Sequence, residues 1–168
     1  MNNIDKIVIR ELKTKEVAIL TDMLYESIFQ SDEANPISRD VIKLPEISQY
    51  IDNFGQRESD YCLIAEFNNK IIGAVWTRIL AGKIKGYGNI DDKTPEFAIS
   101  LYKDYRKQGI GTLLMKRMIS HLIEKGYKQT SLSVQKENYA FRMYQKLGFE
   151  IIRENNKDYL MLLNLRKI

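Results

Sequence analysis

A glycine-spaced turn in the second half of the chain has the composition of a phosphate-binding loop. The turn, Arg106–Thr112, follows the apolar, strand-like run Phe97–Leu101 and opens a helical pattern. The first N–H groups of a helix have no partner inside the helix and carry partial positive charge, so they can bind an anion. Gly109 and Gly111 would let the main chain approach that anion closely, because glycine has no Cβ atom. The turn predicts a phosphate site, with an ordinary helix start as the alternative.

The turn differs from two well-known nucleotide-binding loops. No Gly-x-x-x-x-Gly-Lys-Ser/Thr sequence occurs in the chain, so the turn is not a Walker loop. A dinucleotide-binding turn would need a third small residue where the chain has Leu114. The turn alone therefore does not identify the phosphate ligand.

Further residues stand on both sides of the turn. Glu96 starts the strand before it, and a helical segment follows the strand-like run Ser131–Val134. That segment contains Asn138, Ala140, Tyr144, Gly148 and Phe149. Together with the turn, this order resembles the GNAT superfamily of acyl-CoA-dependent N-acetyltransferases over roughly residues 72–165. The chain has one residue less than the family pattern between the asparagine and the alanine.

The resemblance implies ligand contacts for both motifs. The pyrophosphate of coenzyme A would be held by Arg106, Lys107, Gln108, Gly109, Ile110, Gly111 and Thr112. The pantetheine arm would lie along the main chain of Ile99, Ser100 and Leu101 like an added strand. Asn138 is expected to cap its helix, either alone or while also touching the cofactor. Acetyl-CoA is the expected co-substrate, and no metal ion is expected.

Acetyl transfer to an amine requires two proton transfers. A free alkyl amine has a pKa near ~10.4, so it must lose a proton before it attacks a thioester. Glu96 is the candidate base, directly or through a water molecule; a strand-end carboxylate in solvent is the alternative. Tyr144 shares a helix face with Met143 and Leu147, and the resemblance places the thiol-protonating tyrosine there. A core tyrosine with an internal hydrogen bond is its alternative.

The rest of the chain supplies the elements that position these residues. Apolar runs and turn signals predict strands at 7–12, 60–67, 71–79, 97–101, 130–135, 149–153 and 159–165, and helices at 14–29, 39–54, 110–125 and 138–147. Thr14 is expected to cap the first helix and Pro45 to interrupt the second. The resemblance implies an α/β (α+β) class: a mixed, mostly antiparallel, twisted sheet of about 6–7 strands with helices on both faces. Residues 1–168 would form a single N-acetyltransferase domain.

Composition limits the classes of function. The net charge of +4, from 26 Lys+Arg against 22 Asp+Glu, is mild, and the basic residues are spread along the chain, which disfavours nucleic-acid binding. Cys62, the single cysteine, is expected in the core. Met1–Lys6 has no signal-peptide core, and no apolar run is long enough to span a bilayer. We expect a cytoplasmic protein with no membrane or nucleic-acid partner.

The expected function is an N-acetyltransferase that moves an acetyl group from acetyl-CoA to a primary amine by direct attack. The acceptor would be a small-molecule or peptide amine, bound by the first two helices and the loop Gly82–Asp92. That loop is either a mobile cover for the acceptor or a simple hairpin loop. Family members are often dimers, so a homodimer is possible. The alternative is a non-catalytic acyl-CoA-binding or sensing module on the same fold.

Overall fold

The computed structural model describes residues 6–168, which contain one seven-stranded sheet. The strands are β1 (Val8–Glu11), β2 (Tyr61–Phe67), β3 (Lys70–Arg78), β4 (Glu96–Leu101), β5 (Gln129–Gln135), β6 (Glu150–Glu154) and β7 (Asp158–Asn164). Their order is β1-β2-β3-β4-β5-β7-β6, and every neighbouring pair is antiparallel except β4–β5. The expected mixed, mostly antiparallel sheet is confirmed. Most of the Met1–Lys6 segment lies outside the described residues.

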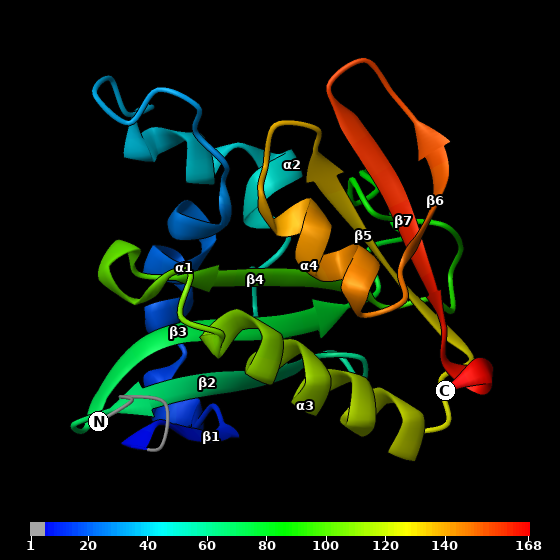
Figure 1. Ribbon diagram of the computed structural model, residues 1–168, viewed down its shortest axis with the longest axis horizontal. Helices are drawn as coiled ribbons and strands as arrows, with labels where there is room; N and C mark the ends of the chain where they lie inside the picture. The colour runs from blue at the N-terminus through cyan, green and yellow to red at the C-terminus, as the bar shows by residue number, and fades with distance from the viewer. Residues whose placement is uncertain (1–5) are drawn as a thin grey trace.

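Helices cover both faces of the sheet (Figure 1). The helices are α1 (Ile19–Ser27), α2 (Pro45–Ser48), α3 (Ile110–Glu124) and α4 (Ala140–Lys146). Helices α1 and α2 pack on one face around Trp76, while α3 and α4 pack on the other around Phe97. The sheet is therefore apolar on both sides, with a separate buried cluster under each helix pair.

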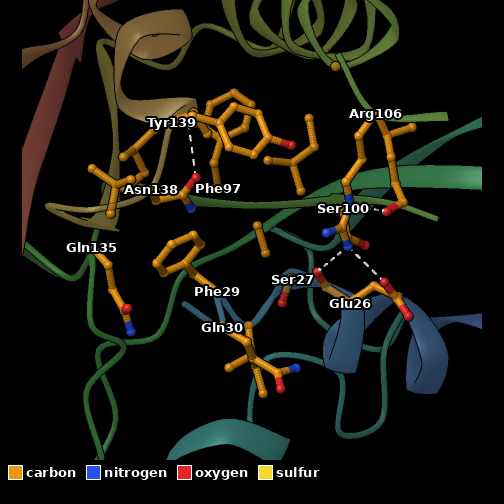
Figure 2. Close-up of a pocket in the computed structure, with 18 of the residues that line it drawn as sticks. Glu26, Ser27, Phe29, Gln30, Phe97, Ser100, Arg106, Gln135, Asn138 and Tyr139 are labelled. Atoms are coloured by element: carbon orange, nitrogen blue, oxygen red, sulfur yellow. Dashed lines mark hydrogen bonds and ion pairs between the residues drawn. The ribbon is translucent and has the colours of Figure 1, made fainter. Parts of the chain in front are cut away.

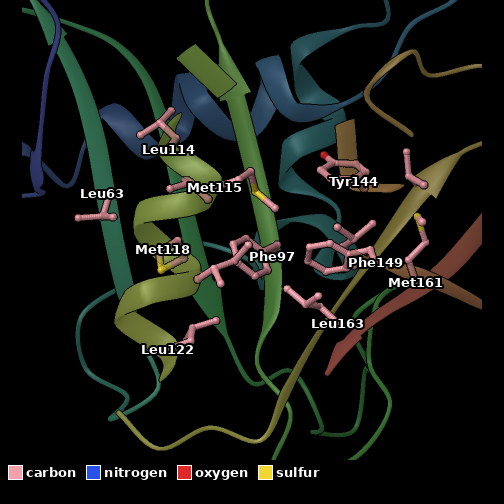
Figure 3. Packing of buried hydrophobic residues seen from close by; sticks show 14 of the residues in the cluster. Leu63, Phe97, Leu114, Met115, Met118, Leu122, Tyr144, Phe149, Met161 and Leu163 are labelled. Carbon is pink, nitrogen blue, oxygen red and sulfur yellow. The ribbon is translucent and has the colours of Figure 1, made fainter. Parts of the chain in front are cut away.

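Helix α3 supplies a large part of the second cluster. Its buried residues are Ile110, Leu114, Met115, Met118, Ile119 and Leu122. They pack with Leu63, Phe97 and Phe149 (Figure 3). The buried positions repeat every three or four residues, as an amphipathic helix requires. Ile123, next to Leu122 at the border of this face, is 40% exposed, so the apolar face ends there.

The N-terminal helical region is shorter than predicted. Residues 14–16 form a separate 3-10 turn, and α1 begins only at Ile19, so the prediction that Thr14 caps this helix is wrong. The Glu16 carboxylate instead accepts a main-chain N–H at the start of that turn. The predicted interruption at Pro45 is confirmed, because the 3-10 turn Arg39–Lys43 stops before it and α2 begins at the proline.

Local residue preferences explain the tight turns. Asn68 (φ 50°) and Asn69 (φ 61°) adopt left-handed conformations and join the antiparallel strands β2 and β3. Asparagine tolerates this region better than most residues do. Gly126 (φ 80°) adopts the same region just after α3, where glycine commonly ends a helix.

The strands β4 and β5 are paired only at one end, so the sheet splits between them. The two strands share a single residue pair, Glu96 with Ser131, and the Ser131 N–H donates to the Pro95 carbonyl at 3.1 Å. Beyond this point the strands diverge, as Figure 1 shows. The divergence leaves β4 with a free edge, which can offer main-chain groups to a ligand.

Cys62 lies in the core, as predicted. It is 3% exposed in β2, and burial raises the pKa of its thiol. A buried, protonated thiol is a poor nucleophile. Of the helices in residues 6–168, none combines the length and the apolar character that a bilayer crossing requires.

Candidate active site

A cavity of about 810 Å³ lies beside the free edge of β4. This volume falls within the usual range for small-molecule sites. Its walls come from β4, from the segment that ends α1, from the turn before α3 and from the segment that joins β5 to α4 (Figure 2). The fold thus brings the glycine-spaced turn and the α4 motif to one cavity.

The start of α3 presents a group of main-chain donors. Gly109 precedes the helix with φ 84°, in the left-handed region that favours glycine, and no side chain caps the helix. The N–H groups of Ile110, Gly111 and Thr112 have no acceptor within the described residues. Ile110 is 1% exposed, so it can offer a ligand only its main chain. These donors suit an anion at the helix start.

The Arg106 side chain reaches α1. Its Nε donates to the Leu101 carbonyl at 2.9 Å, and its Nη2 donates to the Glu26 carboxylate at 2.7 Å (Figure 2). Arg106 therefore fastens the end of β4 to the end of α1, and its charge is balanced by Glu26. The helix N–H groups remain the free donors of the turn.

The next two residues of the turn are held by contacts of their own. Lys107 has φ 59°, and its Nζ lies 5.0 Å from the centre of the Tyr139 ring, a cation–π distance. The Gln108 side-chain amide donates to the Asp104 carbonyl at 2.8 Å. Lys107 keeps a positive charge beside the start of α3, while Gln108 stabilises the turn itself.

The free edge of β4 presents main-chain groups at alternate residues. Tyr102, next after β4, donates its N–H to β3 at 3.0 Å. Since residues of an antiparallel pair face their partner alternately, the main-chain groups of Ile99 and Leu101 face away from β3. Those of Ser100 face β3, and its hydroxyl donates to the Met23 carbonyl at 2.7 Å. All three predicted residues line the cavity; both main-chain groups of Ile99 face a ligand there, whereas at Leu101 the carbonyl already accepts from Arg106 and the N–H is left.

Two residues of the α4 motif line the opposite wall. Asn138 Oδ1 accepts the Ala140 N–H at 2.9 Å (Figure 2), but α4 begins one residue later than predicted, with Tyr139 and not Asn138 at its N-cap. Tyr144 is 7% exposed, and its ring packs edge-on against Phe149. Burial raises the pKa of the Tyr144 hydroxyl, and no hydrogen bond contributes to the shift. Tyr144 is thus a protonated donor at the cavity wall.

Glu96 lies behind the cavity wall, enclosed by the loop that precedes β4. It is 3% exposed, and its Oε1 has no hydrogen-bond partner. A Cβ atom added at Gly86 would lie 1.6 Å from Oε1, and one added at Gly88 would lie 2.4 Å from Oε2. The two glycines therefore leave the space that the carboxyl group occupies. The loop Gly82–Asp92 therefore encloses the Glu96 carboxyl. We had predicted this loop to be either a mobile cover for the acceptor or a simple hairpin loop, and neither prediction included this contact.

Burial raises the pKa of Glu96 from 4.5 to about 7. Interactions with the Tyr50 hydroxyl and the Gly88 N–H oppose this rise, because they stabilise the charged carboxylate. Tyr50 lines the cavity, and its hydroxyl oxygen accepts the Tyr87 N–H at 2.8 Å. A carboxyl group with a pKa near neutrality can gain and lose a proton under physiological conditions.

The segment that carries Tyr50 is anchored by β3. Arg78 is 1% exposed and binds Asp60 through two parallel contacts of 2.8 Å, from Nε and Nη2. Its Nη1 donates to the Gln49 carbonyl at 2.6 Å. Trp76 Nε1 donates to the Tyr50 carbonyl at 3.1 Å. Two hydrogen bonds from β3 thus fix the main-chain carbonyl groups on both sides of the Tyr50 side chain.

Most of the predicted site residues meet at the cavity. Those that line it are Ile99, Ser100, Leu101, Arg106, Lys107, Gly109, Gly111, Thr112, Asn138 and Tyr144. Gln108 and Ile110 belong to the same turn, but their side chains do not line the cavity. Glu96 is buried behind the residues that form the cavity wall. Tyr50 was not predicted as a site residue, since no sequence motif surrounds it. The two glycines Gly86 and Gly88, close before Glu96 in the sequence, were the only local indication that this loop packs against the carboxyl.

Gly86→Ala tests whether the loop is packed against Glu96. We expect a destabilisation of about 1–3 kcal/mol, typical of an overpacked interior, because the new methyl group meets the carboxyl oxygen. Gly82→Ala is the matched control, since no atom lies within 4 Å of its added Cβ. Thermal melting compares the two. Equal melting temperatures would show that the carboxyl group has room to move.

Comparisons with known proteins agree with this geometry. A model described as the acetyltransferase (GNAT) family matches residues 24–149. A curated relative, the [ribosomal protein bS18]-alanine N-acetyltransferase of Haemophilus influenzae, is 33% identical over 108 residues, and the match covers 64% of each chain. The matched part therefore spans less than two thirds of that relative.

Two solved structures have a similar fold. An acetyltransferase of the GNAT family from Streptococcus pneumoniae has a TM-score of 0.66 at 24% identity, covering 94% of this chain and 99% of the other. The PaiA N-acetyltransferase of Thermoplasma acidophilum, in complex with coenzyme A, has a TM-score of 0.65 at 22% identity, covering 94% and 98%. At these identities the likeness shows a shared fold.

Proposed function

The chain belongs to the GNAT family of acetyltransferases, and from this premise we propose that it transfers an acetyl group from acetyl-CoA to a primary amine. One observation carries the proposal: a single cavity runs from the free N–H groups of α3, along the free edge of β4, to Tyr144 and Tyr50. Such a cavity can hold two substrates end to end, so that their reacting groups meet.

The residues around the cavity fit the parts of acetyl-CoA. The N–H groups of Gly111 and Thr112 suit the pyrophosphate, because they stand unbonded at the positive end of a helix. The main chain of Ile99 and the N–H of Leu101 suit the amide groups of the pantetheine arm, which would pair like an added strand. When bound, acetyl-CoA would supply an activated acetyl thioester. Arg106 would hold the end of β4 against the end of α1 beside the bound cofactor.

Glu96 and Tyr144 would carry out the proton transfers. The acceptor arrives as an ammonium ion and must become a neutral amine before it attacks. Glu96, with a pKa of about 7, is charged in a large fraction of molecules at neutral pH and can receive that proton. Tyr144 lies on the opposite wall and can return a proton to the leaving sulfur. This pair of groups argues against the alternative of a non-catalytic binding module.

The acceptor is a small-molecule or peptide amine in this proposal. The relationship to a ribosomal-protein alanine N-acetyltransferase supports a peptide N-terminus as one candidate. At the α1 side of the cavity, Glu26 is paired with Arg106, and Glu33 is paired with Lys103 at 2.5 Å. Little free negative charge is left there for a polyamine, which favours an acceptor with a single amine. A cytoplasmic location and a homodimer stay predictions.

Calorimetry with coenzyme A tests the proposal directly. We expect saturable binding in the micromolar range, and absence of binding at high micromolar concentration would defeat the proposal. Release of free thiol from acetyl-CoA is then measured with alanine-starting peptides, amino acids, aminoglycosides, polyamines and lysine peptides. Binding without thiol release on any of them would support the non-catalytic module instead.

Tyr144→Phe is expected to lower kcat by about 100-fold or more, the usual contribution of a general acid, with little change in affinity for acetyl-CoA. The phenyl ring keeps the packing against Phe149 and removes only the proton donor. Tyr159→Phe, a partly buried tyrosine that packs on Phe141 outside the cavity, is the control. Full turnover by Tyr144→Phe would remove this residue from the mechanism.

A further inference from the structure

Glu96 has no direct access to the cavity that it would serve. Its side chain is 3% exposed and is enclosed by Gly86 and Gly88 on the loop side. Tyr50, in contrast, lines the cavity, and its hydroxyl accepts the N–H of Tyr87, which lies between these two glycines. An amine in the cavity would therefore meet Tyr50 before Glu96.

The hydrogen bonding of the Tyr50 hydroxyl determines where its proton can go. A phenol has one proton to donate and two lone pairs that accept. One lone pair is used by the Tyr87 N–H, at 2.8 Å. That N–H belongs to the residue between Gly86 and Gly88, which enclose the Glu96 carboxyl, so this carboxylate lies near the phenol and can accept its proton. The remaining lone pair is free to accept a proton from the cavity side.

We propose that Tyr50 relays the proton of the acceptor amine to Glu96. The inference rests on the proposed acetyl transfer and adds a residue to it. The ammonium N–H bond breaks as its proton passes to the Tyr50 oxygen. In the same event the original phenol proton passes to a carboxylate oxygen of Glu96. The products are a neutral amine, an unchanged phenol and a protonated Glu96, so atoms and charge balance.

The surroundings of Tyr50 favour a concerted transfer of the two protons over a stepwise one. Burial and the charge of Glu96 raise the pKa of Tyr50, so a free tyrosinate does not accumulate. The other groups near Glu96 are already engaged. Arg78, its cross-strand partner, binds Asp60, and the Ser131 hydroxyl donates to the Gly88 carbonyl at 2.6 Å. Tyr50 is the titratable group that contributes to the Glu96 shift.

The relay is also held in place before substrate arrives. Trp76 binds the Tyr50 carbonyl, and Arg78 binds the carbonyl of the preceding residue, both from the rigid strand β3. The Tyr87 N–H fixes the hydroxyl end of the same ring. A proton acceptor held at both ends needs no rearrangement during the reaction, which is the condition for efficient transfer.

Tyr50→Phe tests the relay. We expect kcat/KM for the amine to fall by 10-fold or more, while the Kd for coenzyme A and the melting temperature stay near the wild-type values. The Tyr50 hydroxyl lowers the pKa of Glu96, so its loss should also move the acidic limb of the pH–rate profile to higher pH. Tyr102→Phe, which removes a partly buried hydroxyl near Asp22 outside the cavity, is the matched control and should change neither quantity.

A second measurement uses the wild-type enzyme and needs no variant. Rates in mixtures of H₂O and D₂O should follow a curved dependence on the deuterium fraction, because two protons move together. A linear dependence, or no isotope effect, overturns the relay. So does a Tyr50→Phe variant within twofold of the wild-type rate, or one whose acidic limb has not moved. If the wild-type chain binds no coenzyme A and releases no thiol, the proposed function itself fails, which is a separate result.

Discussion

Glu96→Gln is expected to lower kcat/KM for the amine by about 10²–10⁴-fold, the usual contribution of a general base. Glutamine has nearly the same shape as glutamate, so it fits between Gly86 and Gly88 but cannot accept the proton. Affinity for acetyl-CoA should not change, because Glu96 lies behind the wall of the cavity. Thiol release measures the first quantity and calorimetry the second.

The same substitution is expected to stabilise the protein at alkaline pH. The pKa of Glu96 rises from 4.5 to about 7 on folding, so between these values the folded state binds more protons than the unfolded state. The free energy of unfolding of the wild type therefore falls as the pH rises through this window. Glutamine carries no charge to bury, so Glu96→Gln should be more stable above pH 7 by on the order of 3 kcal/mol, and the advantage should vanish near pH 4.

Glu150→Gln is the matched control for both effects. Glu150 lies on β6, all of whose residues are exposed, so its charge is not buried in the fold. Urea unfolding at pH 4, 6 and 8 gives the stability difference directly. If Glu96→Gln keeps wild-type turnover, Glu96 is a buried structural acid. If it is less stable than the wild type at pH 8, the proposed burial cost is wrong.

The parts of the site that come from neighbouring residues could be predicted from the sequence. The turn before α3 is an example, because Gly109, the free N–H groups and the apolar helix face lie within one short stretch. The hydrogen bond between Asn138 and the Ala140 N–H is another, since its acceptor and donor are two residues apart. Local preferences and a periodic pattern decide such features, and both can be read from a single sequence.

The contacts that orient the site could not be predicted in this way. Arg106 was expected to bind phosphate, yet it pairs with Glu26, 80 residues away, because the end of β4 lies beside the end of α1. Tyr50 lies near the loop that encloses Glu96 because β3 holds the segment that carries Tyr50 against the sheet. Such pairings depend on strand order and on which face each helix covers. No local pattern around Tyr50 records them.

Arg78→Met is expected to cost about 3–5 kcal/mol, because it leaves the Asp60 carboxylate buried without its partner. Both side chains are almost fully buried, 1% and 0% exposed, and Asp60 also accepts main-chain N–H groups from Gly55 and Arg57. For a chain of this size the melting temperature should fall by roughly 10 °C. Turnover should fall as well, since the substitution frees the segment that carries Tyr50.

The double variant Arg78→Met with Asp60→Leu separates the two causes of that loss. Replacing both charges by apolar groups removes the uncompensated carboxylate, so much of the stability should return. Turnover should stay low, because the hydrogen bond from Arg78 to the Gln49 carbonyl is still missing. Lys43→Met, at an exposed ion pair with Asp40, should leave both quantities unchanged. Recovery of turnover together with stability would mean that Arg78 acts on the core alone and that Tyr50 needs no anchor from β3.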